Sequence, residues 1–274
     1  MTAQGPDDLP FQHYSLKHRV VAWISQNLLD SVTYTVNHGL LKGMRRRGGL
    51  AWLPEFVVRD ETPEISFWKN QNLKDLVIYD IGAFHGLLTM FFARRAKQVI
   101  SYEPNTANRA RLNENLRLNR ISNVSVRTVG LGSKSETVTM FVSPLMPGGA
   151  SVTPHMIEGL QHSKGRVLSE QISVRTLDDD IREMSLPAPD FVKVDVEGQE
   201  LAVLLGARQT LVTNHPQLFL EMHGETLNLK RKAVAEIVSC LKEFGYSDIR
   251  HVESGSAISP ENSSVAAQGH LYCV

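Results

Sequence analysis

The sequence is poor in cysteine and has no excess of charge of either sign. Only Cys240 and Cys273 occur among its 274 residues, and lysine plus arginine equals aspartate plus glutamate at 29 each. Two cysteines exclude a disulfide framework and a cysteine-rich zinc site. A formal net charge of zero provides no overall field that would attract nucleic acid or an anionic surface.

Long apolar runs and targeting signals are lacking too. No apolar run approaches the roughly 18 residues that a membrane-spanning helix requires. The start, MTAQGPDDLP, has neither the basic nor the apolar region of a secretory signal. These absences predict a protein without a membrane span that works in the cytoplasm. The 42% hydrophobic content is enough for a core, in one large domain or one domain with an extension.

From Leu76 onward, short apolar runs alternate with amphipathic stretches. The first five runs are rich in β-branched residues, as in strands buried on both faces of a parallel sheet, and each amphipathic stretch has one apolar stripe. This alternation predicts an α/β fold with helices on both faces of a mostly parallel sheet. The last run lacks a clear preceding helix, so we expect an antiparallel last strand. The expected strands are 76–81, 98–103, 124–130, 190–195, 217–222, 247–252 and 269–274, and the expected helices are 105–119, 199–212 and 229–244.

The first part of the chain departs from this alternation. Residues 13–43 have apolar residues at helical spacing. The spacing predicts a helical extension over residues 1–70 that caps the substrate pocket or pairs with a second subunit, before a domain over residues 71–274. The basic run Arg45–Arg47 is interpreted as a solvated helix end, with a phosphate or membrane-surface contact as the alternative.

A second departure lies within the domain. Residues 133–180 contain two extra short strands around a loop rich in glycine and proline, SPLMPGGASVTP. A loop of this length in a compact domain is usually functional or disordered. We therefore expect an inserted hairpin whose loop, residues 143–165, closes over the substrate as a lid.

The stretch VIYDIGAFHGLLTMFFARRAKQVISYEPN has an acidic residue at the end of each of two neighbouring strands. Asp80 ends the first strand and precedes a turn through Gly82 and Gly86, which lack a Cβ and so let a ligand approach the backbone. Glu103 ends the second strand. Open parallel sheets bind ligands at the carboxyl ends of their strands, and a carboxylate there can accept both hydroxyls of a ribose. The pattern predicts a nucleoside-bearing cofactor.

The charge of this turn favours one cofactor class over another. A dinucleotide-binding turn has the pattern G-x-G-x-x-G and receives a pyrophosphate at a helix N-terminus. Here Phe84 stands at the position of the second glycine and would obstruct a pyrophosphate, which Asp80 would also repel. S-adenosylmethionine carries a sulfonium, an ammonium and no phosphate. The sequence therefore favours S-adenosylmethionine and disfavours a nicotinamide-dependent oxidoreductase.

Several stretches together resemble the FkbM-type S-adenosylmethionine-dependent methyltransferases: VIYDIGAFHGLLTMFFA, VISYEPN, LNENLRLNRISNVSV, FVKVDVEGQELAVLLGA and LFLEMHG. The resemblance covers roughly Val77 to the C-terminus, and DVEGQE is its most specific element. It implies a class I methyltransferase (Rossmann-like) fold, with a seven-stranded sheet whose last strand is antiparallel. It also implies methyl transfer to a hydroxyl of a sugar, polyketide or other secondary metabolite, with S-adenosylhomocysteine as the product.

The resemblance also implies which residues hold the cofactor. The methionine end would lie on the glycine turn, the ribose on Glu103, and the adenine near Gly130 and Leu131. His85 departs from the family, in which this position is often small or acidic. The implied cofactor-binding residues are Asp80, Gly82, Ala83, Phe84, His85, Gly86, Glu103, Pro104, Asn105, Gly130, Leu131 and Asp195.

A base helps methyl transfer to a hydroxyl because the hydroxyl has a high pKa. His223, after the fifth strand, titrates near neutrality and is the first choice for the general base; the alternative is a helix-cap or substrate-orienting histidine. Asp195, after the fourth strand, is the second choice, and Glu197 is a catalytic candidate or an N-cap partner. We interpret Glu200 as a first-turn carboxylate favoured by the helix dipole and Lys193 as an ion-pair partner of Asp195.

Three alternatives remain. Asp195, Glu197, Glu221 and His223 could hold a magnesium ion that lowers the pKa of a diol acceptor, but no ligand spacing is diagnostic, and no metal is predicted. The basic run Arg45–Arg47 keeps open a methyltransferase that acts on RNA or protein. A non-catalytic cofactor-binding module is the third. The histidines without a partner pattern, expected to be solvated or structural, are His155, His162, His215, His251 and His270.

Overall fold

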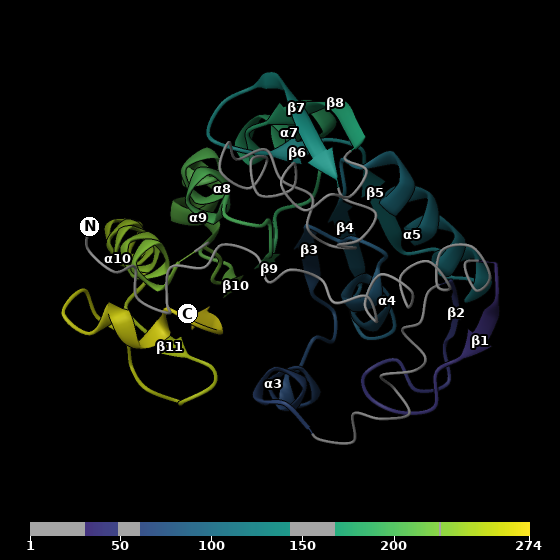
Figure 1. Ribbon diagram of the computed structural model, residues 1–274, viewed down its shortest axis with the longest axis horizontal. Coiled ribbons are helices and arrows are strands. Elements are labelled where there is room, and N and C mark those ends of the chain that lie inside the picture. The colour runs from purple at the N-terminus through teal and green to yellow at the C-terminus, as the bar shows by residue number, and fades with distance from the viewer. Residues whose placement is uncertain (1–30, 49–60, 143–167, 225) are drawn as a thin grey trace, which may run out of the picture. The chain divides into compact units, whose positions relative to one another are not determined.

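The computed structural model describes residues 31–48, 61–142, 168–224 and 226–274 of the chain. Its contacts divide it into two compact units, one ending at Thr128 and one extending from Val129 to Val274. Figure 1 labels the helices and strands of both units. The predicted division at residue 70 between an extension and a domain stays a prediction.

The unit that ends at Thr128 is built around three parallel strands. These are β3 (Val77–Ile81), β4 (Gln98–Tyr102) and β5 (Val124–Arg127), which lie side by side in Figure 1. All five residues of β3 are buried, as its continuous apolar sequence predicts. In contrast, the residues of β5 are half-buried or exposed, because β5 is the edge strand of the sheet.

Three helices accompany these strands among the described residues of the unit. They are α3 (Pro63–Asn70), α4 (Leu87–Ala93) and α5 (Thr106–Leu118). Helix α3 begins with a proline after Thr62, whose hydroxyl accepts a hydrogen bond from the backbone N–H of Ile65. Its Trp68 is fully buried and contacts Phe92 of α4 edge to face, with ring centroids 4.9 Å apart.

The helix predicted over residues 13–43 is wrong for its described part. Two short antiparallel strands, β1 (Thr33–Thr35) and β2 (Arg45–Arg47), occupy this region, and residues 13–30 lie outside the described residues. Side chains of α5 hold β2: the Oδ1 atom of Asn119 accepts from the N–H of Arg45, and that of Asn115 from the N–H of Arg47. These contacts, remote in sequence, outweigh the local helical spacing.

The basic run is therefore part of a strand and not a solvated helix end. Arg46 is 5% exposed and lies over the ring of Tyr34, 6.0 Å from its centroid. Arg47 forms an ion pair with Glu114 of α5 at 3.4 Å. Two of the three arginines thus have partners within their own unit.

The unit from Val129 to Val274 contains four further strands of the central sheet. They are β9 (Phe191–Val194), β10 (Gln217–Glu221), β11 (Ile249–His251) and β12 (His270–Cys273). Strands β9 and β10 are parallel, whereas β12 runs antiparallel to both β10 and β11. The predicted antiparallel last strand is confirmed.

The helices of this unit follow the predicted stripes with one difference. The stretch 199–212 forms two helices, α8 (Glu200–Gly206) and α9 (Arg208–Asn214), that meet at Ala207. In α10 (Leu227–Glu243), the predicted apolar face is buried, and Gly245 follows its end with a φ of +94°. The described part of this unit also contains α7 (Leu177–Met184) and the 3₁₀ helix η1 (Ser263–Ala266).

The predicted insertion forms a separate three-stranded sheet. Strand β8 (Leu168–Arg175) pairs antiparallel with β7 (Glu136–Val142) and parallel with β6 (Gly130–Leu131). This arrangement confirms the hairpin. The whole of the predicted lid, 143–165, lies outside the described residues, as do residues 166 and 167.

The central sheet has seven strands in the order β11-β12-β10-β9-β3-β4-β5. With β12 antiparallel and helices between the parallel strands, this confirms the predicted class I methyltransferase fold. Among the residues that the structure describes, no helix is long and apolar enough to cross a membrane.

Gly86, the residue before α4, is a sensitive point of the fold. It has a φ of +82°, and a Cβ added to it would lie 2.2 Å from the Cδ1 atom of the buried Leu112. We expect Gly86→Ala to lower the free energy of unfolding by about 2–4 kcal/mol, because backbone strain adds to overpacking. Urea denaturation measures this free energy.

Gly43→Ala is the matched control. Gly43 has a nearly identical φ of +84° but no atom within 4 Å of the added Cβ. This variant should show only the backbone strain, about 1 kcal/mol. Equal losses in the two variants would contradict the expected clash with Leu112.

Candidate functional site

The glycine turn after β3 is anchored to the end of β4. The backbone N–H groups of Gly82 and Ala83 both donate to the carbonyl oxygen of Tyr102, at 3.1 and 3.0 Å. Gly82, Phe84 and Gly86 all have positive φ, of 79°, 50° and 82°. A positive φ is unusual for a phenylalanine and shows how tightly the chain turns here. The phenyl ring of Phe84 stacks on the ring of His85, with centroids 3.7 Å apart.

Glu103 lies against this turn, as the sequence predicts. Its two carboxylate oxygens accept hydrogen bonds from the backbone N–H groups of Phe84, at 2.8 Å, and Asn105, at 2.9 Å. The side chain is 5% exposed. The carboxylate is therefore fixed between the glycine turn and the start of α5. The predicted turn and the predicted strand-end carboxylate thus lie together within one unit.

Asp80 is fully buried at the end of β3. Its Oδ2 atom accepts a hydrogen bond from the hydroxyl of Thr89 at 2.5 Å, and Thr89 in turn accepts one from Ser101 at 3.2 Å. The sequence analysis missed Thr89 and Ser101. Both are small polar residues inside otherwise apolar runs, and that contrast was the available signal. Asp80 thus belongs to a buried polar cluster beneath the turn.

Asn115 of α5 connects the turn to the β1–β2 hairpin. Its side-chain amide donates to the carbonyl oxygen of His85 at 2.9 Å and accepts from the N–H of Arg47 at 3.0 Å. Asn115 is fully buried, so both groups need partners inside the protein. This residue, too, was missed by the sequence analysis.

Four other predicted cofactor residues have these places. Asn105 is the N-cap of α5, and Pro104 precedes it, with its carbonyl oxygen accepting from Arg109. Gly130 and Leu131 form β6 in the unit that starts at Val129.

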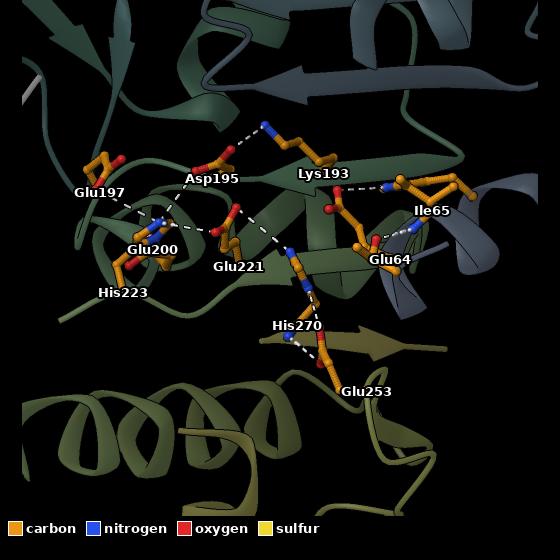
Figure 2. A network of polar contacts seen from close by, with 12 residues as sticks. Glu64, Ile65, Lys193, Asp195, Glu197, Glu200, Glu221, His223, Glu253 and His270 are labelled. Carbon is orange, nitrogen blue, oxygen red and sulfur yellow. Dashed lines mark hydrogen bonds and ion pairs between the residues drawn. The ribbon is translucent and has the colours of Figure 1, made fainter. Parts of the chain in front are cut away.

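In that second unit, Asp195 follows the end of β9 (Figure 2). Its Oδ2 atom forms an ion pair with the Nζ atom of Lys193 at 3.1 Å. Lys193 is 4% exposed, so its ammonium is a buried positive charge next to a half-buried carboxylate. The predicted ion pair of these two residues is confirmed.

His223, two residues beyond the end of β10, is the centre of a group of carboxylates (Figure 2). Its Nδ1 atom lies 2.8 Å from an oxygen of Glu200. Its Nε2 atom lies 3.7 Å from Asp195, 3.8 Å from Glu197 and 3.6 Å from Glu221. The structure thus brings together the three predicted catalytic residues His223, Asp195 and Glu197.

The carboxylates set the charge of the imidazole. Burial alone lowers the pKa of His223, but the hydrogen bond with Glu200 and the charges of the nearby carboxylates outweigh burial and raise this pKa to about 9. Burial raises the pKa of Glu197, whereas the interaction with His270 lowers that of Glu221. At neutral pH the imidazole of His223 is therefore protonated, so it accepts a proton only after it has lost its own.

The loop between β9 and α8 differs from the sequence interpretation. Gln199 is the N-cap of α8, and no side chain makes the cap hydrogen bond, so Glu197 is not the N-cap partner. Glu197 itself has a φ of +50°, followed by Gly198 at +91°. Glu200 is the first residue of α8, but its buried side chain bonds His223 and the N–H of Gly198, a role beyond the predicted dipole contact.

Two further histidines, His251 and His270, lie beside the carboxylates around His223 and share Glu253 as a partner. Glu253 accepts from His270 at its Nδ1 atom, at 2.6 Å, and lies 2.9 Å from the Nε2 atom of His251. His270 also lies 3.8 Å from Glu221. His251 and His270, which show no partner pattern in the sequence, are buried and paired. The interpretation of both as structural is consistent with these contacts.

Three of these side chains could hold a metal ion. One ligand atom from each of Asp195, Glu221 and His223 lies within 4.8 Å of the others. Carboxylate oxygens with one imidazole suit a divalent cation such as Mn²⁺ or Mg²⁺. The magnesium alternative from the sequence therefore has three of its four candidate ligands close together, without Glu197.

Sequence comparisons with known proteins identify the family of this chain. Residues 80–247 match the methyltransferase FkbM domain. Methyltransferase 1 of Beauveria bassiana is 30% identical over 145 residues, which cover 48% of this chain and 58% of the relative. The hexuronic acid methyltransferase AglP of Haloferax volcanii is 29% identical over 154 residues, which cover 56% and 59%. The chain thus spans less than two thirds of the length of these curated relatives.

Among solved structures, the methyltransferase FkbM from Methylobacillus flagellatus KT is similar to this chain. The two are 22% identical with a TM-score of 0.46, over 73% of this chain and 44% of that one. The FkbM match, in contrast, covers more than half of this chain, from the end of β3 to beyond α10. The chain therefore belongs to the FkbM methyltransferase domain family.

Proposed function

We propose that the protein binds S-adenosylmethionine and transfers its methyl group to a hydroxyl of a small molecule such as a sugar or polyketide. The observation that carries the proposal is the carboxylate of Glu103, held against the glycine turn by two backbone N–H groups. A carboxylate at this place suits ribose hydroxyls. Phe84, at the position where a dinucleotide-binding turn has glycine, disfavours a pyrophosphate.

The proposed contacts follow the turn. Gly82, Ala83 and Gly86 let the methionine end approach the backbone. Asp80 is fully buried under the turn. In the proposed site it attracts a cationic ligand by its negative charge and offers the ligand no exposed hydrogen-bonding group. The rest of the proposed cofactor contacts are Phe84, His85, Pro104, Asn105, Gly130, Leu131 and Asp195.

In the proposed reaction His223 is the general base, with Asp195 and Glu197 orienting the acceptor. The acceptor oxygen attacks the sulfonium methyl in line, and alignment with exclusion of water lowers most of the barrier. Removal of the hydroxyl proton by a nearby base assists. His223 has the geometry for this role because Nε2 faces the open side of the carboxylate group, whose side chains are 31–40% exposed.

The negative charge of the carboxylates around His223 limits which acceptor molecules can bind. Asp195, Glu197 and Glu221 would repel a phosphate or a carboxylate on the acceptor. We therefore favour a neutral polyhydroxyl acceptor over RNA, the main alternative, although AglP is named for a hexuronic acid. A non-catalytic cofactor-binding module is disfavoured because the catalytic candidates lie together. A homodimer and a cytoplasmic location stay predictions.

Cofactor binding is the first test. We expect Glu103→Gln to weaken binding of S-adenosylhomocysteine at least about tenfold, because a charged acceptor of two ribose hydroxyls is lost. Isothermal titration calorimetry measures the affinity. The control is Glu61→Gln, whose exposed carboxylate forms an ion pair with Lys69. No heat with the unaltered protein would refute the proposed function.

The pH dependence tests the base. Because the pKa of His223 is about 9, the fraction of neutral imidazole rises about tenfold from pH 7 to 8 and about fivefold from pH 8 to 9. We expect the rate of methyl transfer to neutral glycosides to rise over this range, and His223→Gln to remove the rise. A rate that stays flat in the unaltered protein would exclude His223 as the base.

Metal removal tests the remaining alternative. Base-assisted transfer requires no ion, so we expect dialysis against EDTA to change the rate by less than about twofold. A loss of activity that Mn²⁺ or Mg²⁺ restores would instead show that Asp195, Glu221 and His223 hold an essential metal ion.

A further inference from the structure

We propose that Glu200 is a positioning residue that holds His223 by Nδ1 and so turns Nε2 toward the acceptor side of the site. The inference deepens the proposed function, on which the role of His223 depends. Glu200 was interpreted from the sequence only as a helix-start carboxylate. Its contacts assign it a more specific task.

Glu200 differs from the other carboxylates around His223 in burial and in distance. Its side chain is 3% exposed and its Oε1 atom is 2.8 Å from Nδ1, which is hydrogen-bonding distance. Asp195, Glu197 and Glu221 are 31–40% exposed and lie 3.6–3.8 Å from Nε2. They act on the imidazole by charge, whereas Glu200 acts through a hydrogen bond.

A buried carboxylate is costly unless it is paired and hydrogen-bonded. Here the N–H of Gly198 donates to Oε1 of Glu200 at 3.1 Å, and the position at the start of α8 suits a negative charge. The remaining partner is the imidazole of His223. Glu200 is thus kept in place by its own loop and helix.

The bond determines the tautomer of the imidazole. An ionised carboxylate only accepts hydrogen bonds, so the hydrogen between Glu200 and His223 belongs to Nδ1. When the imidazole is neutral, Nε2 therefore carries the lone pair. That is the nitrogen facing Asp195, Glu197 and Glu221 (Figure 2).

The bond also connects two strand ends. Glu200 belongs to the helix that follows β9, and His223 follows β10, which is the parallel neighbour of β9 in this unit. Leu220 of β10 is in register with Val194 of β9. The bond thus fixes the place of the imidazole relative to Asp195, at the end of the neighbouring strand.

With this tautomer, the hydroxyl proton and the methyl group each have a defined destination in the proposed reaction. The acceptor oxygen forms a bond to the methyl carbon as the carbon–sulfur bond of S-adenosylmethionine breaks, and the electron pair of that bond stays on sulfur. The hydroxyl proton passes to Nε2 of His223, while the hydrogen on Nδ1 stays on that nitrogen and keeps its hydrogen bond to Glu200. The products are a methyl ether, S-adenosylhomocysteine and a protonated imidazole that returns its proton to water.

Histidine ¹⁵N NMR tests the inference without an acceptor. The ring signals of His223 are assigned by their loss in His223→Gln and followed from pH 7 to 10. In the unaltered protein we expect the neutral ring to carry its hydrogen on Nδ1. A neutral ring with the hydrogen on Nε2 would overturn the inference, even if no Glu200 variant folds.

Variants sharpen the test. In Glu200→Gln we expect the Nε2–H tautomer to appear and the His223 pKa to fall, while Glu200→Asp keeps part of the effect. Glu253→Gln is the matched control, because Glu253 bonds the Nδ1 atom of another histidine, His270, in the same unit. This control should leave the His223 signals unchanged. Unchanged His223 signals in Glu200→Gln would overturn the inference.

Activity separates this inference from the proposed function. With a neutral glycoside that is methylated, Glu200→Gln should lower kcat about 10- to 100-fold and leave the affinity for S-adenosylhomocysteine unchanged. An unchanged kcat would overturn the positioning role. If the unaltered protein binds no S-adenosylhomocysteine, the proposed function fails, whereas the NMR result on Glu200 stands or falls by itself.

Discussion

The concentration of negative charge at the ends of β9 and β10 is the constraint on which the candidate chemistry depends. Four carboxylates surround one imidazole, and the described charges that balance them are that imidazole and the buried ammonium of Lys193. Such a group is stable only if protons or cations stay with it. The retained proton of His223 expresses this requirement.

In the unit that ends at Thr128, the constraint is that a tightly turning backbone must keep its N–H groups hydrogen-bonded. The turn after β3 has three residues with positive φ, yet its N–H groups are satisfied by the carbonyl oxygen of Tyr102 and the carboxylate of Glu103. The same bonds that stabilise the turn hold the carboxylate that we propose to bind the ribose. Stability and the proposed recognition therefore use the same atoms.

The strands of the sheet and the turn after β3 could be predicted from the sequence, because each depends on a local pattern of residue types. Apolar runs gave the strands of the sheet, and the spacing of Asp80, Gly82 and Glu103 gave the turn and its carboxylate. The β1–β2 hairpin could not be predicted, since it depends on amide side chains of α5, remote in sequence. The bond of Glu200 with His223 spans 23 residues and depends on two strands lying in register, which no local pattern records.

Asn115 gives the unit that ends at Thr128 an unexpected mechanical property. One carboxamide joins the carbonyl group of His85, in the glycine turn, to the backbone of Arg47, in the hairpin. A molecule that displaces the hairpin would therefore transmit force to the turn through the amide of Asn115. The first described strands of the chain are in this way mechanically coupled to the turn on which the proposed cofactor site depends.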